Sequence, residues 1–411
     1  MILPDAQNLR LNIDSVRALR VAGRAAEAQA MITRLAALPD PGIWIGQLGI
    51  DLNYLGMREL AERCLRIALT HDMSPLVRYQ LTEELAMVLY SSGKYHEAHA
   101  LHRINRDVGR GESLLHVLFS SDMPWIDLAR PKLLGIDEPV AGKSILISIE
   151  GGFGDFVLYS RYVDALLREG ARELVIEVFD EWRDVVRPRE GVRLVIPTAE
   201  QRAHEMQHCD RITYVFNLFA RYQHSPYFPM ENPGGMIACN PNRGLPHEAL
   251  ASMQREPKRM KVGIGWRSAS NVRHEPYRSM QLQQLAALFA NPDCRFYSLQ
   301  VGALTDDERA LMQAHDVIDM APYLAAFGDT AYVLDELDLF ITIDSGPAHL
   351  AGALNRPVWV LLANACDCRW YDCQRFTPWY PSMRLYRQTQ LGDWSHPLDE
   401  LQADLAQLAA R

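Results

Sequence analysis

The chain has 411 residues, of which 48% are hydrophobic and 23% charged, and its formal net charge at pH 7 is −9. This length allows two or three domains, and the composition is typical of a globular protein. The acidic balance, with no long basic run, disfavours non-specific binding to nucleic acid.

The first residues lack the basic segment and apolar core of a signal peptide. No stretch approaches the ~18 consecutive apolar residues that a membrane span needs. Seven cysteines in a chain of this length do not form a disulfide framework, and their odd number is consistent with reduced thiols. We therefore expect a cytoplasmic protein without a membrane span.

Residues 1–110 are predicted to be helical and to carry a repeated pattern, a glycine followed five residues later by an alanine. The three copies are Gly23 with Ala28, Gly56 with Ala61, and Gly93 with Ala98. The period is close to that of tetratricopeptide repeats, which is about 34 residues. The pattern places each glycine in the turn between paired helices and each alanine where helices approach closely. Small residues at this spacing also arise by chance in helical bundles.

Residues 111–142 contain several prolines and are interpreted as a linker. From residue 143 to about 240, strand patterns alternate with helical ones, which predicts a parallel sheet covered on both faces. The strands of this region are expected at 144–149, 173–179, 192–196 and 211–216. A stretch rich in proline, glycine and asparagine at 226–244 marks the next boundary.

The alternation restarts over residues 255–411. Strands are expected at 261–266, 295–300, 338–343, 357–363 and 384–387, and helices at 280–290, 305–314 and 398–410. We therefore predict an α/β fold with two Rossmann-like halves. A ligand cleft is expected between the halves, beyond the carboxyl ends of their strands.

The stretch from Leu339 to Leu354 is the most informative in the chain. An apolar strand ends in Asp344, Ser345 and Gly346 and passes into a helix that carries His349. Unpaired N–H groups and the helix dipole favour anions at such a helix terminus, so we predict a phosphate-bearing ligand there. The alternative is a buried strand–helix turn that Asp344 or Ser345 merely caps.

A glycine-rich turn follows the first strand of the first half. Gly151, Gly152 and Gly154 allow a tight turn and a close approach to a ligand, although they do not form a dinucleotide fingerprint. Asp155 stands at the start of the following helix. It is interpreted either as a general base for an acceptor hydroxyl or as a structural N-cap.

Two strand ends of the second half supply further candidates for donor binding. Trp266, Arg267 and Ser268 end one strand, and the fork of Arg267 suits a diphosphate. A surface arginine after a buried tryptophan is the alternative. Leu299 and Gln300 end the next strand, where we predict contacts with a nucleobase.

Five motifs in order carry a resemblance to a known family. They lie at 150–155, 263–268, 297–300, 344–349 and 377–386. Together they resemble tetratricopeptide-containing glycosyltransferases related to the heptosyltransferases, the glycosyltransferase family 9 clan of GT-B fold. The resemblance covers the chain from Lys143 onward.

The resemblance implies inverting sugar transfer from a nucleoside-diphosphate sugar without an essential metal. Asp155 matches the family's proposed base, and the segment from Asp344 to His349 resembles the part that receives the donor diphosphate. ADP-heptose is the donor that the resemblance favours. The family's lysine near the donor phosphates is missing, so Arg267 or Arg273 would replace it.

Cys366, Cys368 and Cys373 lie within eight residues. Related autotransporter heptosyltransferases carry an iron-holding cysteine motif, but its four-cysteine arrangement is not reproduced here. A structural iron or zinc ion at these thiols is one interpretation, and incidental free cysteines are the other.

We therefore predict a glycosyltransferase whose acceptor is a protein, docked on the repeats, or a glycan. A non-catalytic scaffold with a nucleotide-binding GT-B module, and another sugar-nucleotide enzyme of epimerase or phosphorylase type, are the alternatives. The repeats leave self-association into a homo-oligomer open.

Overall fold

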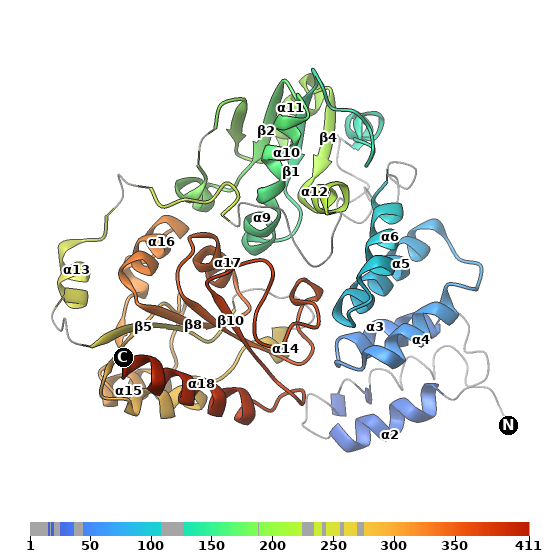
Figure 1. The fold of residues 1–411 in the computed structure, drawn as a ribbon. Coiled ribbons are helices and arrows are strands. Elements are labelled where there is room, and N and C mark those ends of the chain that lie inside the picture. The colour runs from blue at the N-terminus through green and yellow to red at the C-terminus, as the bar shows by residue number, and fades with distance from the viewer. Residues whose placement is uncertain are drawn as a thin grey trace. The chain divides into compact units, whose positions relative to one another are not determined.

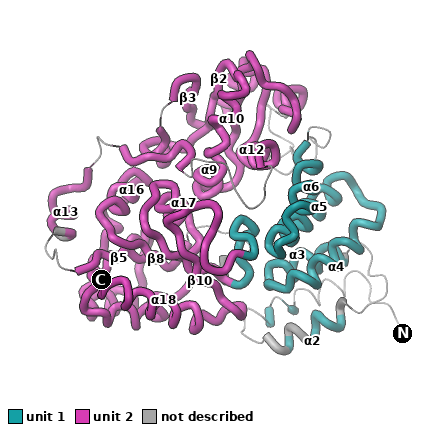
Figure 2. The backbone as a smooth tube through the Cα atoms, viewed as in Figure 1, with its two compact units in different colours: residues 1–117, 272–276, 364–372 teal, residues 118–271, 277–363, 373–411 magenta. Residues whose placement is uncertain are grey.

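The computed structural model of the protein describes residues 15–16, 18–19, 25–36, 44–107, 126–187, 189–223, 234–240, 244–254, 259–268 and 275–410. The chain divides into two compact units (Figure 2). Unit 1 contains residues 1–117, 272–276 and 364–372. Unit 2 contains residues 118–271, 277–363 and 373–411.

Unit 1 contains a series of helices (Figure 1). They are α2 (Ala25–Ala36), α3 (Trp44–Asn53), α4 (Arg58–Ala68), α5 (Pro75–Ser91) and α6 (Tyr95–Arg106). The helix α3 packs on α4, and α5 packs on α6.

Gly56 and Gly93 lie in the turns of these two helix pairs, each with φ of +74°, a left-handed conformation that favours glycine. Ala61 and Ala98 are fully buried. The turn positions predicted for Gly56 and Gly93 are therefore confirmed, whereas Gly23 lies outside the described residues. The assignment of the helices to tetratricopeptide repeats stays a prediction.

A segment that follows strand β9 (Val358–Leu362) also belongs to unit 1. The carbonyl oxygen of Asn364 accepts a hydrogen bond from Nη2 of Arg58 at 2.7 Å. At the other end of the segment, the Asp372 carboxylate accepts one from the hydroxyl of Tyr95. Both ends of residues 364–372 are thus bound to residues just after the helix turns.

The first sheet of unit 2 is fully parallel, with strand order β3-β2-β1-β4. Its strands are β1 (Ser144–Ser148), β2 (Glu173–Glu177), β3 (Val192–Val195) and β4 (Arg211–Tyr214). The short helices α8 (Ile126–Ala129) and η2 (Arg130–Lys132) precede β1, and Leu133 bridges to Ile212 of β4.

The connections of this half are mostly short helices. They are α9 (Phe153–Tyr159), η3 (Ser160–Tyr162), α10 (Val163–Arg168), η4 (Asp180–Val185), α11 (Ala199–His208) and α12 (Val215–Tyr222), and α13 (His247–Gln254) leads towards the second sheet.

The second sheet is also parallel, with strand order β7-β6-β5-β8-β9-β10. Besides β9, its strands are β5 (Met260–Gly265), β6 (Cys294–Ser298), β7 (Ile318–Asp319), β8 (Leu339–Ile343) and β10 (Met383–Arg387). Counted along the chain, this is the 3-2-1-4-5-6 order of a Rossmann fold. The predicted α/β class with two parallel sheets is therefore confirmed.

Helices cover both faces of the second sheet (Figure 1). The helices α16 (Phe327–Glu336) and α17 (Gly346–Ala353) lie on one side. On the other side lie η5 (Leu282–Ala290), α15 (Asp306–Ala314) and the closing helix α18 (Ser395–Ala409). The remaining helices are α14 (Glu275–Arg278), η6 (Ala321–Tyr323) and η7 (Cys368–Trp370).

Leu401 and Leu405 of α18 pack into a core that includes Trp266, Ile341 and Trp359. This closing helix was predicted over 398–410, and it begins three residues earlier. Among the described residues, no helix is both long and apolar enough to cross a membrane.

Candidate functional site

The order of the second sheet defines where a ligand is expected. The strands β5 and β8 are neighbours from which the chain winds in opposite directions. In open α/β sheets the ligand crevice lies beyond the carboxyl ends of two such strands. Residues 266–268 follow β5 and residues 344–346 follow β8, so the sheet brings together two of the predicted donor-binding segments.

Among the residues that the structure describes, no side chain caps the amino terminus of α17, where this helix follows β8. The strand β8 is buried throughout. Ser345 is the N-cap residue with extended backbone, but its side chain accepts no hydrogen bond from the helix, and Pro347 stands in the first turn. The Ser345 hydroxyl instead lies 3.4 Å from that of Thr342. A helix terminus without a side-chain cap and without an acidic residue in its first turn is suited to an anion.

His349 lies on the first turn of α17 and is almost fully buried. Its Nε2 is 3.7 Å from Oδ1 of the buried Asp344, and its Nδ1 is 3.1 Å from the hydroxyl of Tyr380. The imidazole is therefore hydrogen-bonded at Nδ1, while its Nε2 faces the Asp344 carboxylate beyond hydrogen-bond distance.

The glycine-rich turn after β1 is shaped around Asp155. Gly151 has φ of +79°. A Cβ atom on this glycine would lie 2.4 Å from Oδ2 of Asp155, so a side chain there would displace the carboxylate. Gly152 is the N-cap of α9, and its N–H donates to Oδ2 of Asp155 at 2.8 Å. Asp155 is thus the third residue of the helix, and its side chain accepts a hydrogen bond from the backbone of the N-cap residue. The interpretation of Asp155 as the N-cap itself was wrong.

The turn that carries Asp155 contacts the start of α17. A Cβ atom on Gly154 would lie 2.7 Å from Cδ2 of His349, and one on Gly346 would lie 3.3 Å from the Phe153 ring. The ring of Phe153 stacks on Phe327 with centroids 3.7 Å apart. The predicted neighbours Gly151–Asp155 and Gly346–His349 are therefore brought together, with packed rings beside them.

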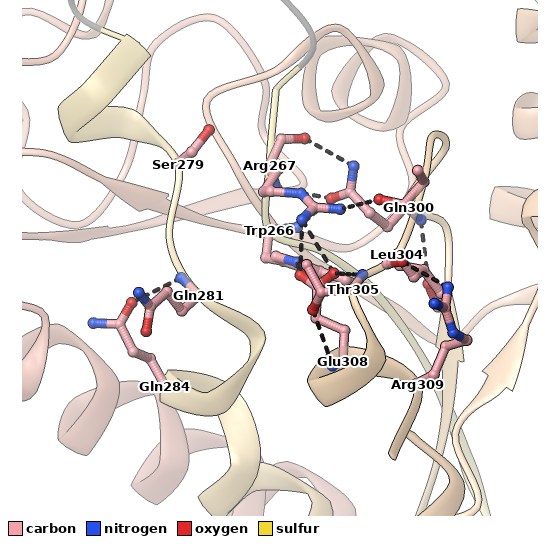
Figure 3. Close-up of polar contacts among 12 residues, drawn as sticks. Trp266, Arg267, Ser279, Gln281, Gln284, Gln300, Leu304, Thr305, Glu308 and Arg309 are labelled. Atoms are coloured by element: carbon pink, nitrogen blue, oxygen red, sulfur yellow. Dashed lines mark hydrogen bonds and ion pairs between the residues drawn. The ribbon is translucent and has the colours of Figure 1, made fainter. Parts of the chain in front are cut away.

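The end of β5 is tied to a buried carboxylate (Figure 3). Nε1 of Trp266 donates to Oε1 of Glu308 at 2.8 Å, and Nη1 of Arg267 donates to the two carboxylate oxygens at 2.9 and 3.1 Å. Thr305 and Glu308 also form a capping box at the start of α15. Burial by itself would raise the pKa of Glu308, but the Thr305 and Trp266 hydrogen bonds and the charge of Arg267 lower it below the ordinary value.

Gln300 joins the ends of β5 and β6 (Figure 3). Its Oε1 accepts from the backbone N–H groups of Trp266 and Arg267 at 3.1 and 2.7 Å. Its Nε2 donates to the carbonyl oxygens of Arg267 and Val301 at 3.2 and 3.1 Å. In this structure both groups of the amide therefore bind backbone, and a nucleobase is not needed to satisfy them.

The other predicted donor-binding residues lie near these strand ends. Leu299 is buried, and its N–H donates to the carbonyl of Ile264. The hydroxyl of Ser268 accepts from Nη2 of Arg278 at 2.7 Å. Arg273 lies outside the described residues.

Cys366, Cys368 and Cys373 are not brought together as a metal centre. Within the described part of the chain, no three His, Cys, Asp or Glu side chains are grouped so that they could hold a metal ion. Burial and the charge of Asp367 raise the pKa of the Cys368 thiol well above its ordinary value. An iron or zinc ion at these thiols stays a prediction, which the grouping of the described side chains does not support.

Glu308 was not predicted as a residue of the site, and the contact of Tyr380 with His349 was not predicted either. The Thr305-x-x-Glu308 spacing is a capping-box signature that identifies Glu308 as a cap. It does not reveal the partners Trp266 and Arg267. Tyr380 belongs to a group of buried aromatic residues with Trp370, Tyr371 and Trp379.

Residues 309–388 match the sequence model of glycosyltransferase family 9 (heptosyltransferase). This match covers less than half of the chain, and it includes β8, α17 and Tyr380. The region that carries the β8–α17 junction is therefore similar to this family of transferases.

The individual proteins that resemble this chain have low sequence identity to it. A protein named FlbA from Caulobacter vibrioides is 23% identical over 357 residues, which is 80% of this chain and 56% of its own length. The chain thus spans about half of that relative. A glycosyl transferase of family 9 from Veillonella parvula has a similar structure, with a TM-score of 0.45, 12% identity, and coverage of 67% of this chain and 99% of its own. ADP-heptose lps heptosyltransferase II of E. coli has a TM-score of 0.40 and 17% identity, with coverage of 64% and 99%.

Proposed function

We propose that the protein is a glycosyltransferase that moves a sugar from a nucleoside-diphosphate sugar to a hydroxyl group of a protein or glycan, with inversion at the anomeric carbon. The observation that carries the proposal is the contact between the turn of Gly154 and His349 of α17. Asp155 directly follows Gly154 in the chain, which supports a carboxylate near a helix terminus suited to a diphosphate. The family 9 match over residues 309–388 supports the same class of reaction.

In the proposed reaction, Asp155 takes the proton of the acceptor hydroxyl as that oxygen attacks the anomeric carbon. The bond between this carbon and the diphosphate oxygen breaks, and the electron pair leaves with the nucleoside diphosphate. The amino terminus of α17 and His349 stabilise the charge that develops on the leaving group. Because the loop of Gly154 already contacts α17, the two halves of unit 2 must part to admit the donor.

Heptose from ADP-heptose is our best candidate for the transferred sugar. The residues proposed to bind the donor at the β8–α17 junction are Asp344, Ser345, Gly346 and His349. The donor-binding roles of Trp266, Arg267, Ser268, Leu299 and Gln300 stay predictions. Arg267 would have to exchange its contact with Glu308 for one with the diphosphate. The proposed reaction requires no metal.

The acceptor and the assembly state complete the proposal. The helices of unit 1 are proposed to dock an acceptor protein, in the manner of helical-repeat surfaces. The cytoplasm is the proposed location, and a homo-oligomer the proposed alternative to a monomer.

One observation favours a second candidate, a nucleotide-binding scaffold without transferase activity. Oδ2 of Asp155 accepts a hydrogen bond from Gly152, so this carboxylate has a structural role whether or not it is a base. A scaffold would keep the cap and the anion site but would transfer no sugar.

The substitution Asp155→Asn separates these two candidates. The amide oxygen of asparagine still accepts the Gly152 N–H, but the side chain no longer takes a proton at neutral pH. We expect the transfer rate to fall by about 10²–10⁴-fold, the usual contribution of a general base. The affinity for the nucleoside diphosphate, measured by calorimetry, should stay unchanged. The donor for the assay is identified by mass spectrometry of nucleotide sugars that co-purify with the protein.

Asp329→Asn is the matched control. Asp329 stands at the third position of α16 and accepts from the N–H of Ala326 at 2.9 Å, so it has the same capping role as Asp155. If only the cap matters, both variants will lose activity to the same small degree. Transfer by Asp155→Asn at the rate of the control would refute the catalytic assignment.

A further inference from the structure

Two glycines make room for a pair of buried rings at the start of α17. A Cβ atom on Gly154 would lie 2.7 Å from Cδ2 of His349, and one on Gly352 would lie 2.5 Å from Cγ of Tyr380. The rings of His349 and Tyr380 meet edge to face, with centroids 5.7 Å apart. Both side chains are almost fully buried, so neither ring has room to turn away from the other.

The two nitrogens of His349 face different groups. Nδ1 is 3.1 Å from the hydroxyl of Tyr380, and Nε2 is 3.7 Å from Oδ1 of Asp344. A neutral imidazole has one N–H donor and one acceptor nitrogen, and its partners decide which nitrogen carries the proton. A carboxylate accepts hydrogen bonds only, so Asp344 favours a proton on Nε2.

A buried cation favours Tyr380 as the donor in its contact with His349. The guanidinium carbon of Arg161 lies 5.3 Å from the centroid of the Tyr380 ring and 5.1 Å from that of Trp379. Arg161 is buried and donates to the carbonyl oxygens of Leu158 and Trp379 at 2.7 and 3.2 Å. A positive charge over the ring draws electron density from the phenol, which strengthens the hydroxyl as a donor and weakens it as an acceptor.

We propose that Tyr380 is a positioning residue that holds His349 in the tautomer with the proton on Nε2. In this tautomer the Nε2–H points towards Asp344 and presents a donor at the end of β8, where an oxygen of the diphosphate is proposed to bind. The inference rests on the proposed function only for the nature of that anion. The tautomer itself is a property of the ligand-free protein.

The first test measures the tautomer in the unliganded wild-type chain. Nitrogen NMR on protein labelled with ¹⁵N-imidazole histidine distinguishes a protonated ring nitrogen from an acceptor nitrogen, and His349→Gln identifies the signals of His349. We expect a single neutral form with an acceptor Nδ1 and a protonated Nε2. A proton on Nδ1 would overturn the inference, and this result needs no variant of Tyr380 to fold.

The second test uses Tyr380→Phe, with Tyr162→Phe as the control. Tyr162 is a buried tyrosine of the same unit whose hydroxyl donates to Oε1 of Gln223 at 2.7 Å, so its variant loses a comparable hydrogen bond elsewhere. We expect Tyr380→Phe to give a mixture of His349 tautomers and to weaken the binding of ADP by roughly tenfold. Adenosine, which lacks phosphates, should bind with unchanged affinity.

The outcomes separate this inference from the proposed function. An unchanged tautomer in Tyr380→Phe, or an equal loss of ADP affinity in the control, refutes the positioning role. If the tautomer shifts as expected but no nucleoside diphosphate binds to the wild type, the positioning role stands and the proposed donor site fails.

Discussion

The buried carboxylate of Glu308 accepts four hydrogen bonds. The donors are the indole of Trp266, the guanidinium of Arg267, which reaches both carboxylate oxygens, and the backbone N–H of Thr305. The Glu308 side chain is 5% exposed and that of Arg267 30% exposed. Removing the negative charge leaves these donors without an ionised acceptor, which is more damaging than the loss of an exposed ion pair.

We expect Glu308→Gln to lower the free energy of unfolding by about 2–4 kcal/mol at pH 7, as measured by urea denaturation. The pKa of Glu308 is lowered by folding, so its contribution is complete above the unfolded value of about 4.5 and is lost as the pH falls through the folded value. The difference between variant and wild type should therefore shrink in acid. Glu181→Gln, at an exposed position, should change stability by less than about 0.5 kcal/mol. Equal effects of the two variants would contradict the argument.

At the scale of the residue, local patterns were predictable and distant partners were not. Gly346 and Pro347 after an apolar strand identify the start of α17 from sequence alone, because both residues suit a helix start there. The partners of His349 and Arg267 could not be predicted in this way, because they lie far away in the sequence. Tyr380 is 31 residues from His349 and Glu308 is 41 residues from Arg267, and only the packed sheet brings each pair together.

At the scale of the element, the errors have packing causes. The strand predicted at 211–216 ends at Tyr214, and the helix α12 begins at Val215. Valine and phenylalanine favour strands, but Val215, Leu218 and Tyr222 form a buried helical face, and α12 packs on α9. The helix predicted over 280–290 is the 3₁₀ helix η5. The helix α16 was not predicted, since its residues include weak helix formers such as Gly328 and Thr330.

The segment 364–372 allows an element-scale prediction. We expect Gly56→Ala to loosen this segment, because a Cβ atom on Gly56 would lie 2.0 Å from Oδ1 of Asn364. Alanine also resists the left-handed conformation, by roughly 1–2 kcal/mol. Amide hydrogen exchange within 364–372 should become faster in this variant.

Gly142→Ala is the control for this prediction. Gly142 has the same φ of +74°, but a Cβ atom on it would meet no atom of the described part of the chain within 4 Å. This variant carries the backbone cost alone, so exchange within residues 364–372 should keep its wild-type rate. If amide exchange within residues 364–372 became faster in both variants, the clash between a Cβ atom at Gly56 and Asn364 would not be the cause.

At the scale of the whole molecule, the division of the chain differs from a simple series of domains. The sequence predicts a boundary near residue 110, and unit 1 contains residues 1–117. However, unit 1 also includes residues 364–372, more than 250 positions further along. Periodicity describes neighbours in the chain, so it gives no sign that such a distant segment completes the helical unit.

Each unit contains a carboxylate whose pKa is lowered by folding. In unit 1, Oε1 of Glu83 lies 2.9 Å from Nδ1 of His102 and 3.6 Å from Nε of Arg106. Its Oε2 accepts a hydrogen bond from Nδ2 of Asn105 at 2.9 Å. Burial opposes ionisation, but the charges of His102 and Arg106 and these hydrogen bonds outweigh it and lower the pKa of Glu83 to about 2. Glu308 is the corresponding group of unit 2. A substitution of Glu83 or of Glu308 should therefore report on the stability of one unit at a time.

We predict that thermal unfolding shows two transitions, one for each unit, because units with their own cores unfold separately unless their interface is large. Glu83→Gln should lower only the transition of unit 1, and Glu308→Gln only that of unit 2. Because the pKa of Glu83 is about 2 in the folded unit and about 4.5 when unfolded, its stabilisation is about 3 kcal/mol at neutral pH. This stabilisation is lost as the pH falls from about 4.5 to about 2. Calorimetry at pH 7 and pH 3 should thus show a smaller acid shift of the unit 1 transition in Glu83→Gln than in the wild type. A single transition that both substitutions lower would show that the units unfold together.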